Sequence, residues 1–310
     1  MFAATLLVLT VSACSAPATQ DATSLKCPRY TEGGNVSKVQ VTGEANSVPK
    51  VDFTAPIDSE IIETKVIKEG TGTTFIGDSF IDFDFLAVNG ATGKVLTASA
   101  FNGKDFGSQM IAAGGYPDFC HGLSGIKEGS RVAMLFPASL SHNSQPSQDG
   151  SLAAKDSILY VLDLKKVYPN KADGAEQPAP DGFPVVVRAA DGTPGLTQLK
   201  TVAPSEFKLA TLIKGSGAVV QENQKVTVQY SGFVWGGDKF DSSWDRQSPS
   251  QFQLSKGAVI DGFVKAIAGQ TIGSQVIAII PPAEGYGDQE QSGIPANSTL
   301  IFVIDILGAN

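Results

Sequence analysis

Alternation of apolar and polar residues is clearest in the last third of the chain. Val226, Val228 and Tyr230 alternate with Thr227 and Gln229, which predicts a strand with one buried face and one solvated face. Similar runs, rich in β-branched and aromatic residues, predict further strands. They lie at residues 251–254, 275–280 and 300–307.

A short helix is predicted between two of these strands. Phe263 and Ile267 lie four positions apart, on one face of a helix over 261–268, and Asp261 stands near its start. The helix and strands together predict a strongly bent antiparallel sheet wrapped on one short helix, which is an α+β fold.

The same pattern occurs earlier in the chain at a nearly constant distance. Tyr230 follows the strand residue Phe85 by 145 positions, and Gly269 follows Gly125 by 144. A period this long indicates a duplicated domain rather than a solenoid. We therefore expect two domains of the same α+β class.

Pro, Gly, Asp and Ala dominate residues 169–182, which have no apolar periodicity and are predicted to be a linker. This places one domain at 47–168 and the other at 183–310. Each domain has a proline-containing segment ahead of its main strands, at 47–49 and 192–194. We expect each segment to pack against its own domain as an edge strand or arm.

Residues 1–14 are apolar, too few to span a bilayer but long enough for the core of a signal peptide. Val11–Cys14 resembles a bacterial lipobox, whose cysteine is lipidated. No Lys or Arg precedes the apolar run, as expected if translation starts upstream of Met1. Residues 15–46, which begin with small polar side chains, are predicted to be a tether. The alternative for residues 1–14 is a buried N-terminal strand or helix.

Lipidation of Cys14 would leave Cys27 and Cys120 as a pair in an oxidising compartment, where disulfides persist. We expect a Cys27–Cys120 disulfide that pins the N-terminal arm to the first domain. The alternative is two separate reduced thiols, with Cys120 buried.

Composition and motifs exclude several functional classes. The net charge of −8 argues against a nucleic-acid partner, because phosphate binding needs clustered Lys and Arg. Only two histidines are present, which leaves little room for a catalytic triad or a His-based metal site. The glycines at 232–237 lack the Gly-Lys-Ser/Thr ending of a phosphate loop. We expect neither a metal nor a cofactor.

Five blocks in the C-terminal domain resemble the FKBP-type peptidyl-prolyl cis-trans isomerase (rotamase) domain, in its order and close to its spacing. The blocks are Val228–Gly232, Lys239–Ser243, Val259–Phe263, Ile280–Gly287 and Ile294–Phe302. Together with the residues between them they cover about a quarter of the chain. The resemblance implies two FKBP-like domains and a proline-binding pocket in the second.

The resemblance also implies roles for individual residues. The implied catalytic residues are Tyr230, Phe240, Asp241, Tyr286 and Phe302, and the implied substrate-binding residues are Phe252, Val259, Ile260, Phe263 and Ile294. Tyr286 can donate a hydrogen bond to a substrate carbonyl. Asp241 either orients a tyrosine or polarises the carbonyl carbon, and the sequence leaves both roles open.

Three departures from the family pattern bear on ligand preference. Phe263 stands where many members have a tryptophan floor, and Ser250 stands where an aromatic wall residue is common. The loop at 287–293 is acidic and contains no histidine.

The N-terminal domain keeps the scaffold pattern but not these residues. Phe85 takes the place of the strand tyrosine, and Lys94–Thr97 takes the place of the block that carries Asp241, so the carboxylate is absent. His142 takes the place of Tyr286. The domain is either an altered pocket that uses His142 as a donor or, as we favour, a non-catalytic domain for docking or substrate holding.

The sequence therefore predicts a lipid-anchored, extracytoplasmic prolyl isomerase that aids protein folding, with its active site in the C-terminal domain. Its expected partners are proline-containing polypeptide clients, macrolides of the rapamycin class, and the membrane through the lipid anchor. The alternatives are a peptide-binding or chaperone lipoprotein without turnover, and a structural envelope protein whose pocket is filled by its own side chains.

Overall fold

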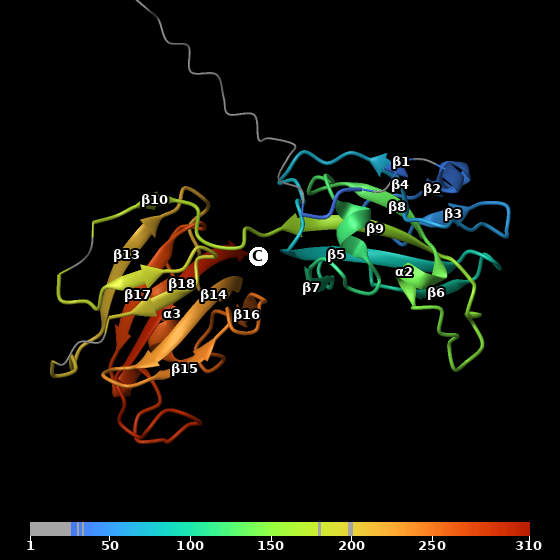
Figure 1. Ribbon diagram of the computed structural model, residues 1–310. Coiled ribbons are helices and arrows are strands. Elements are labelled where there is room, and N and C mark those ends of the chain that lie inside the picture. The colour runs from blue at the N-terminus through green and yellow to red at the C-terminus, as the bar shows by residue number, and fades with distance from the viewer. Residues whose placement is uncertain (1–25, 30, 33, 179–180, 198–200) are drawn as a thin grey trace, which may run out of the picture.

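The computed structural model describes residues 26–29, 31–32, 34–178, 181–197 and 201–310. It contains two twisted seven-stranded sheets, each with a short helix on one face (Figure 1). The N-terminal sheet has the order β1-β4-β8-β9-β5-β6, with β7 paired to β5. The C-terminal sheet has the order β10-β13-β17-β18-β14-β15, with β16 paired to β14. The two halves of the chain thus share one strand order, but the first edge strand differs: β1 runs parallel to β4, whereas β10 runs antiparallel to β13.

The N-terminal half begins with β1 Thr31–Glu32, η2 Gly34–Lys38, β2 Gln40–Thr42, β3 Lys50–Asp52, β4 Glu63–Lys68 and β5 Ser79–Asn89. It continues with β6 Val95–Ala98, β7 Gly107–Ile111, α1 Phe119–Leu123, β8 Arg131–Phe136, α2 Ala138–Ser141 and β9 Ile158–Val167. The C-terminal half begins with β10 Ala175–Glu176, β11 Val186–Arg188, β12 Pro194–Leu196, β13 Lys208–Lys214, β14 Lys225–Val234 and β15 Lys239–Ser242. It ends with β16 Ser250–Gln253, α3 Asp261–Ile267, β17 Gln275–Ile280, η3 Pro282–Glu284 and β18 Leu300–Ala309.

The inner face of each sheet packs on its helix and forms the larger core of that half. In the C-terminal half, α3 buries Phe263, Val264 and Ile267 against β14, β17 and β18. Burial of this apolar face stabilises a helix of only two turns, which would not form alone in water.

The outer face of each sheet is also covered, so the expectation of a solvated face is wrong. Thr227 and Gln229, on the face of β14 predicted to be wet, are 1% and 6% exposed. An apolar cluster on this side of the C-terminal sheet, with Ile277, Ile301 and Val303 at its centre, packs against residues of the β11–β12 hairpin. Alternation of apolar and polar residues along one strand does not predict whether another segment of the chain packs on its polar face.

The proline-containing segments at 47–49 and 192–194 belong to these covers. In the N-terminal half, Val41 and Val51 of the β2–β3 hairpin pack on the outer cluster of the sheet. Each hairpin is a separate two-stranded sheet, so each segment is part of an arm rather than an edge strand of the main sheet.

The predicted tether and linker differ from the structure. Within 15–46, the part from residue 34 onward forms η2 and β2, and Val36 and Val39 are fully buried against the sheet. Within 169–182, β10 pairs with β13, and the Ala172 amide donates to the buried Asp305 carboxylate at 2.8 Å. Both segments therefore add backbone pairing and buried surface to the adjacent half.

The two halves meet at Tyr168, directly after β9. Its hydroxyl donates to Asp82 at 2.6 Å, and the Asn310 amide donates to the same carboxylate at 3.3 Å. The ring packs with Leu307 and lies over Gly308, where a Cβ would come within 2.4 Å of it. The end of β18 thus contacts the N-terminal half directly.

Cys27 and Cys120 form a disulfide, with the sulfur atoms 2.05 Å apart. Both cysteines are fully buried, and the bond joins the N-terminal arm to α1. The predicted signal peptide and Cys14 lie outside the described residues. No helix within the described ranges is long and apolar enough to cross a membrane.

The first prediction concerns this disulfide. Replacing both cysteines, Cys27→Ser with Cys120→Ser, should lower the free energy of unfolding of the N-terminal half by about 2–4 kcal/mol, because the bond closes a long loop. Urea unfolding followed by hydrogen exchange measures each half separately. An equal loss of protection in the C-terminal sheet would contradict a local role.

Candidate functional site

A cavity of about 240 Å³ opens on the inner face of the C-terminal sheet, beside α3. Its lining residues are Tyr230, Phe240, Asp241, Phe252, Ala258, Val259, Ile260, Phe263, Tyr286 and Phe302. The structure therefore brings together nine of the ten residues singled out in the sequence. Ile294 is the exception, because it is buried in the adjacent core but is not among the lining residues.

The walls of this cavity are aromatic rings that hold one another in place. Phe263 on α3 is 4% exposed, and its ring centre lies 5.4 Å from that of Phe252 and 5.5 Å from that of Phe302. The rings meet edge to face, the arrangement that their charge distribution favours. The cavity is thus preformed, and its floor is apolar.

Gly232 is required by the close packing of two of these rings. A Cβ at this position would come within 2.5 Å of Phe240 and 2.9 Å of Phe302. Gly232 pairs with both strands that carry these residues, opposite Phe302 on β18 and Asp241 on β15. The absence of a side chain on β14 therefore lets the rings close over the strand.

One side of the cavity carries a polar cluster. The Tyr230 hydroxyl donates a short hydrogen bond to Asp241, and Arg246 donates to the other oxygen of the same carboxylate. Arg246 also donates to the Tyr230 oxygen at 3.0 Å and to Ser250 at 3.3 Å. Of the two roles left open for Asp241, this geometry supports orientation of a tyrosine.

These contacts stabilise the charged form of Asp241. Burial acts to raise its pKa, but the hydrogen bonds from Tyr230 and Arg246 outweigh burial and lower the pKa below the usual value. Burial raises the pKa of Tyr230 to about 12, and donation to Asp241 adds to this effect. At neutral pH the cluster therefore holds a carboxylate, a neutral phenol and a guanidinium.

Tyr286 stands apart from this cluster. It lines the cavity, is partly buried, and has no hydrogen-bond partner for its hydroxyl among the residues that the structure describes. Burial, aided by the charge of Asp241, raises its pKa, so the hydroxyl stays protonated. It is therefore available as a donor to a bound molecule.

Two residues of the site were not found from the sequence. Ala258 lines the cavity, but a lone alanine carries no signal of its own. Arg246 follows Asp241 by five positions in the turn after β15. A carboxylate among aromatic rings needs a cation or donors, and Arg246 is the only arginine within 50 residues of Asp241. That signal could have identified it.

The N-terminal half does not reproduce the polar cluster. Thr97 pairs with Ala87 as Asp241 pairs with Gly232, which shifts the alignment expected from the sequence by one residue. The carboxylate is absent in either alignment. His142 is not a cavity donor, because its ring nitrogens lie 2.7 and 2.9 Å from the backbone oxygens of Gln145 and Asp156.

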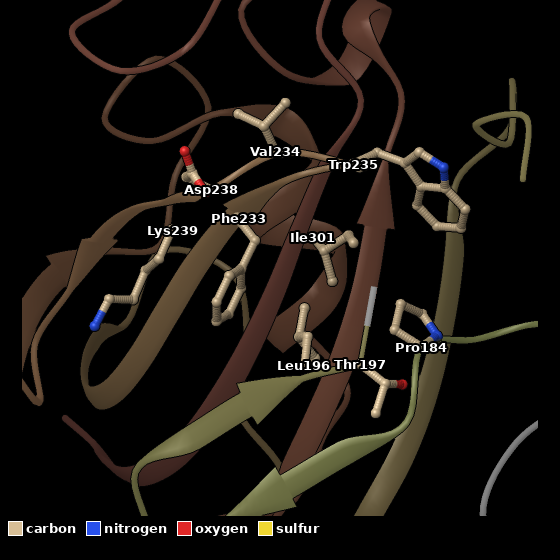
Figure 2. A pocket seen from close by; sticks show the side chains of 11 residues that line it. Pro184, Leu196, Thr197, Phe233, Val234, Trp235, Asp238, Lys239 and Ile301 are labelled. Atoms are coloured by element: carbon tan, nitrogen blue, oxygen red, sulfur yellow. The ribbon is translucent and has the colours of Figure 1, made fainter. Parts of the chain in front are cut away.

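A smaller cavity, of about 130 Å³, lies on the outer face of the C-terminal sheet. Figure 2 shows Phe233 and Ile301 of the sheet near Leu196 of the covering arm. The Trp235 indole donates to the backbone oxygen of Thr201 at 2.9 Å, which ties the covering segment to the sheet. This cavity is therefore a gap between the sheet and its cover, on the opposite face of the sheet from the cavity beside α3.

Comparisons with known proteins point to the C-terminal half. Residues 217–307 match the family described as "FKBP-type peptidyl-prolyl cis-trans isomerase". An "FK506-binding protein" of Streptomyces anulatus is 38% identical over 107 residues, which are 34% of this chain and 86% of the relative. The "Peptidyl-prolyl cis-trans isomerase Fkbp12" of Drosophila melanogaster is 39% identical over 102 residues, 32% of this chain and 94% of the relative.

Among solved structures, the three FKBP domains of wheat FKBP73 align with 80% of this chain and 94% of that chain. The sequence identity is 19% and the TM-score is 0.37.

The second prediction tests Arg246. Arg246→Met should lower kcat/KM for a substrate that binds this cavity by about twofold to fivefold. The half-exposed ion pair between Arg246 and Asp241 contributes at most about 1 kcal/mol. Arg188→Met is the matched control, since Arg188 bonds Gln275 and Glu176 away from the cavity. Equal losses in kcat/KM for the two variants would refute a role for Arg246 in the site.

The third prediction concerns pH. Because the pKa of Asp241 is lowered, the site should keep its activity as the pH falls to about 4, the ordinary range of aspartate, and lose it only below. Arg246→Met removes one hydrogen bond to the carboxylate, so the loss should begin at higher pH. An exchange measurement by NMR avoids a coupling enzyme that itself titrates. Identical acid limbs in the two proteins would contradict this account.

Proposed function

Because this chain belongs to the FKBP-type peptidyl-prolyl cis-trans isomerase family, we propose that the aromatic cavity of its C-terminal half is where it isomerises X-Pro bonds in extracytoplasmic proteins. The observation that carries the proposal is that a preformed apolar cavity has the hydrogen-bonded Tyr230–Asp241–Arg246 cluster along one side.

The reaction requires rotation but no bond making or breaking. Amide resonance sets a barrier of about 18–20 kcal/mol, and the unaided X-Pro bond takes tens to hundreds of seconds to rotate. In the twisted state the nitrogen loses conjugation, and the carbonyl loses part of its dipole. The enzyme therefore needs to bind the twisted form more tightly than either planar form, and it needs no nucleophile.

The apolar floor suits this requirement. A proline ring fits against Phe263, Val259 and Ile260, which surround the inner end of the cavity with hydrocarbon. A planar amide has the larger dipole and loses more solvation on entry than a twisted one. Exclusion of water by these rings thus favours the twisted state.

The polar residues orient the bound peptide. The free Tyr286 hydroxyl donates to a carbonyl of the substrate, in the role expected from the sequence. Asp241 is already held by Tyr230 and Arg246, so its charge needs no rearrangement when substrate binds. Its role in this proposal is to fix the phenol and the local field, and no proton is transferred.

The proposed compartment follows from two features. The buried Cys27–Cys120 disulfide is of the kind that persists in oxidising compartments. The apolar run at 1–14 with its lipobox-like end supports a lipid anchor at Cys14 on the bacterial cell membrane. The clients would then be proline-containing polypeptides that fold outside the cytoplasm. Because the Streptomyces relative is named for binding FK506, rapamycin-class macrolides are proposed as competing ligands.

The fourth prediction tests the activity itself. The full chain should accelerate cis-trans exchange of a short proline peptide, and Asp241→Ala should lower kcat/KM by about tenfold, the effect of losing one charge-assisted hydrogen-bond network. His142→Ala is the control and should leave the rate unchanged, because His142 lies outside both cavities. Exchange spectroscopy by NMR gives the rates.

An uncatalysed rate with the full chain would overturn the enzyme proposal. Peptide binding without acceleration would instead support the alternative, a peptide-binding or chaperone lipoprotein.

A further inference from the structure

The N-terminal half has its own cavity, of about 310 Å³, on the inner face of its sheet. The lining residues are Phe83, Phe85, Ala87, Leu96, Thr97, Gln109, Pro117, Phe119, Ile158 and Tyr160. These residues come from β5, β6, β7, α1 and β9, and from the segment before α1. Most of these side chains are apolar, and none is ionised at neutral pH. The exposed residues Thr97 and Gln109 form part of the rim of the cavity.

Strand register places this cavity where the C-terminal half has the aromatic one. Tyr160 of β9 pairs with Ala87 of β5, as Phe302 of β18 pairs with Gly232 of β14. The two cavities therefore occupy the same place in the two copies of the fold.

The rings on the two central strands are exchanged between the copies. Where the C-terminal cavity has Tyr230 on one strand and Phe302 on its partner, the N-terminal cavity has Phe85 and Tyr160. The phenol has thus moved from the strand beside the carboxylate to the opposite strand. Its new position lacks the neighbours that fix Tyr230.

Tyr160 presents to this cavity a hydroxyl that has no partner among the described residues. The residue is 7% exposed, its ring centre lies 5.0 Å from Phe119, and no described residue accepts a hydrogen bond from its hydroxyl. Burial raises its pKa, so the group remains a neutral phenol at physiological pH. The hydroxyl oxygen is open to the cavity, so a bound carbonyl can replace water as the acceptor of its hydrogen bond.

We propose that the N-terminal cavity is a second peptide-binding site, which holds an apolar or proline-bearing segment of a polypeptide while the Tyr160 hydroxyl donates to one of its backbone carbonyls. That the bound polypeptide is a client of the isomerase rests on the proposed function. The site holds peptide without twisting it, because it has no counterpart of the Tyr230–Asp241–Arg246 cluster. Binding that does not favour the transition state leaves the reaction rate unaltered.

The shared position of the two cavities in the fold favours a polypeptide ligand over a small metabolite. The cavity offers apolar surface, a phenol donor and no charged lining residue, which suits an uncharged peptide segment better than an anion or a cation.

The fifth prediction uses the full chain and a blocked tetrapeptide, Ala-Leu-Pro-Phe, as the probe. Backbone amide NMR should show peptide-dependent shifts at Phe85, Ala87 and Leu96, in addition to those at the C-terminal cavity. Tyr160→Phe should raise the Kd read from these N-terminal shifts by about twofold to tenfold, the value of one hydrogen bond.

Two further variants serve as a control and as a block of the cavity. Tyr168→Phe removes another buried phenol of the same half, outside the cavity, and should leave the N-terminal Kd unchanged. Ala87→Leu fills the cavity and should abolish the N-terminal shifts while the C-terminal shifts persist.

The outcomes separate this inference from the proposed activity. Shifts confined to the C-terminal cavity at millimolar peptide would overturn the second site and leave the isomerase proposal intact. N-terminal shifts in a protein that does not accelerate exchange would support the second site and overturn the isomerase proposal alone. An equal rise in Kd for Tyr160→Phe and Tyr168→Phe would refute the role of the Tyr160 hydroxyl.

Discussion

The antiparallel pairing of β14 with β18 is the constraint on which the C-terminal half depends. Tyr230 pairs with Ile304 and Gly232 with Phe302, so the rings of Tyr230 and Phe302 face the helix and the cavity. A slip of one residue would turn these rings to the outer face, because side chains alternate along a strand. Both faces are covered by apolar clusters, which makes such a slip costly on either side.

Comparison of the two halves distinguishes contacts that the fold requires from contacts that belong only to the site. The Tyr230 amide donates to the Ser243 hydroxyl at 2.8 Å, and the corresponding Phe85 amide donates to Ser99 at 3.0 Å. This bond, which joins a central strand to the segment after its neighbour, is thus part of the scaffold. Among the residues that the structure describes, the Asp241 cluster has no counterpart in the N-terminal half, so it is not required to build the cavity.

Much of the inner core could be predicted from the sequence, because apolar periodicity reports burial against an adjacent element. The covers of the outer faces could not. Burial of Thr227 and Gln229 depends on contacts that no local pattern records, and Val36 and Val39 lie in a stretch whose composition resembled a tether. The position of Arg246 was missed for a related reason: its contact with Asp241 depends on the conformation of a turn, which a strand pattern does not describe.

The inner-face cavity of the C-terminal half thus has a fixed charge beside it, whereas no charged residue lines that of the N-terminal half. Rings alone can bind a proline segment, since they supply hydrocarbon surface to planar and twisted amides alike. Preference for the twisted amide needs donors and dipoles whose positions are set before the substrate arrives, because rearranging them would consume the energy they provide. Tyr230, Asp241 and Arg246 fix one another by three mutual contacts, and Tyr160 has no such neighbours. The difference in polar contacts, more than any difference in cavity size, is therefore the basis on which we propose turnover in the C-terminal half and holding in the N-terminal half.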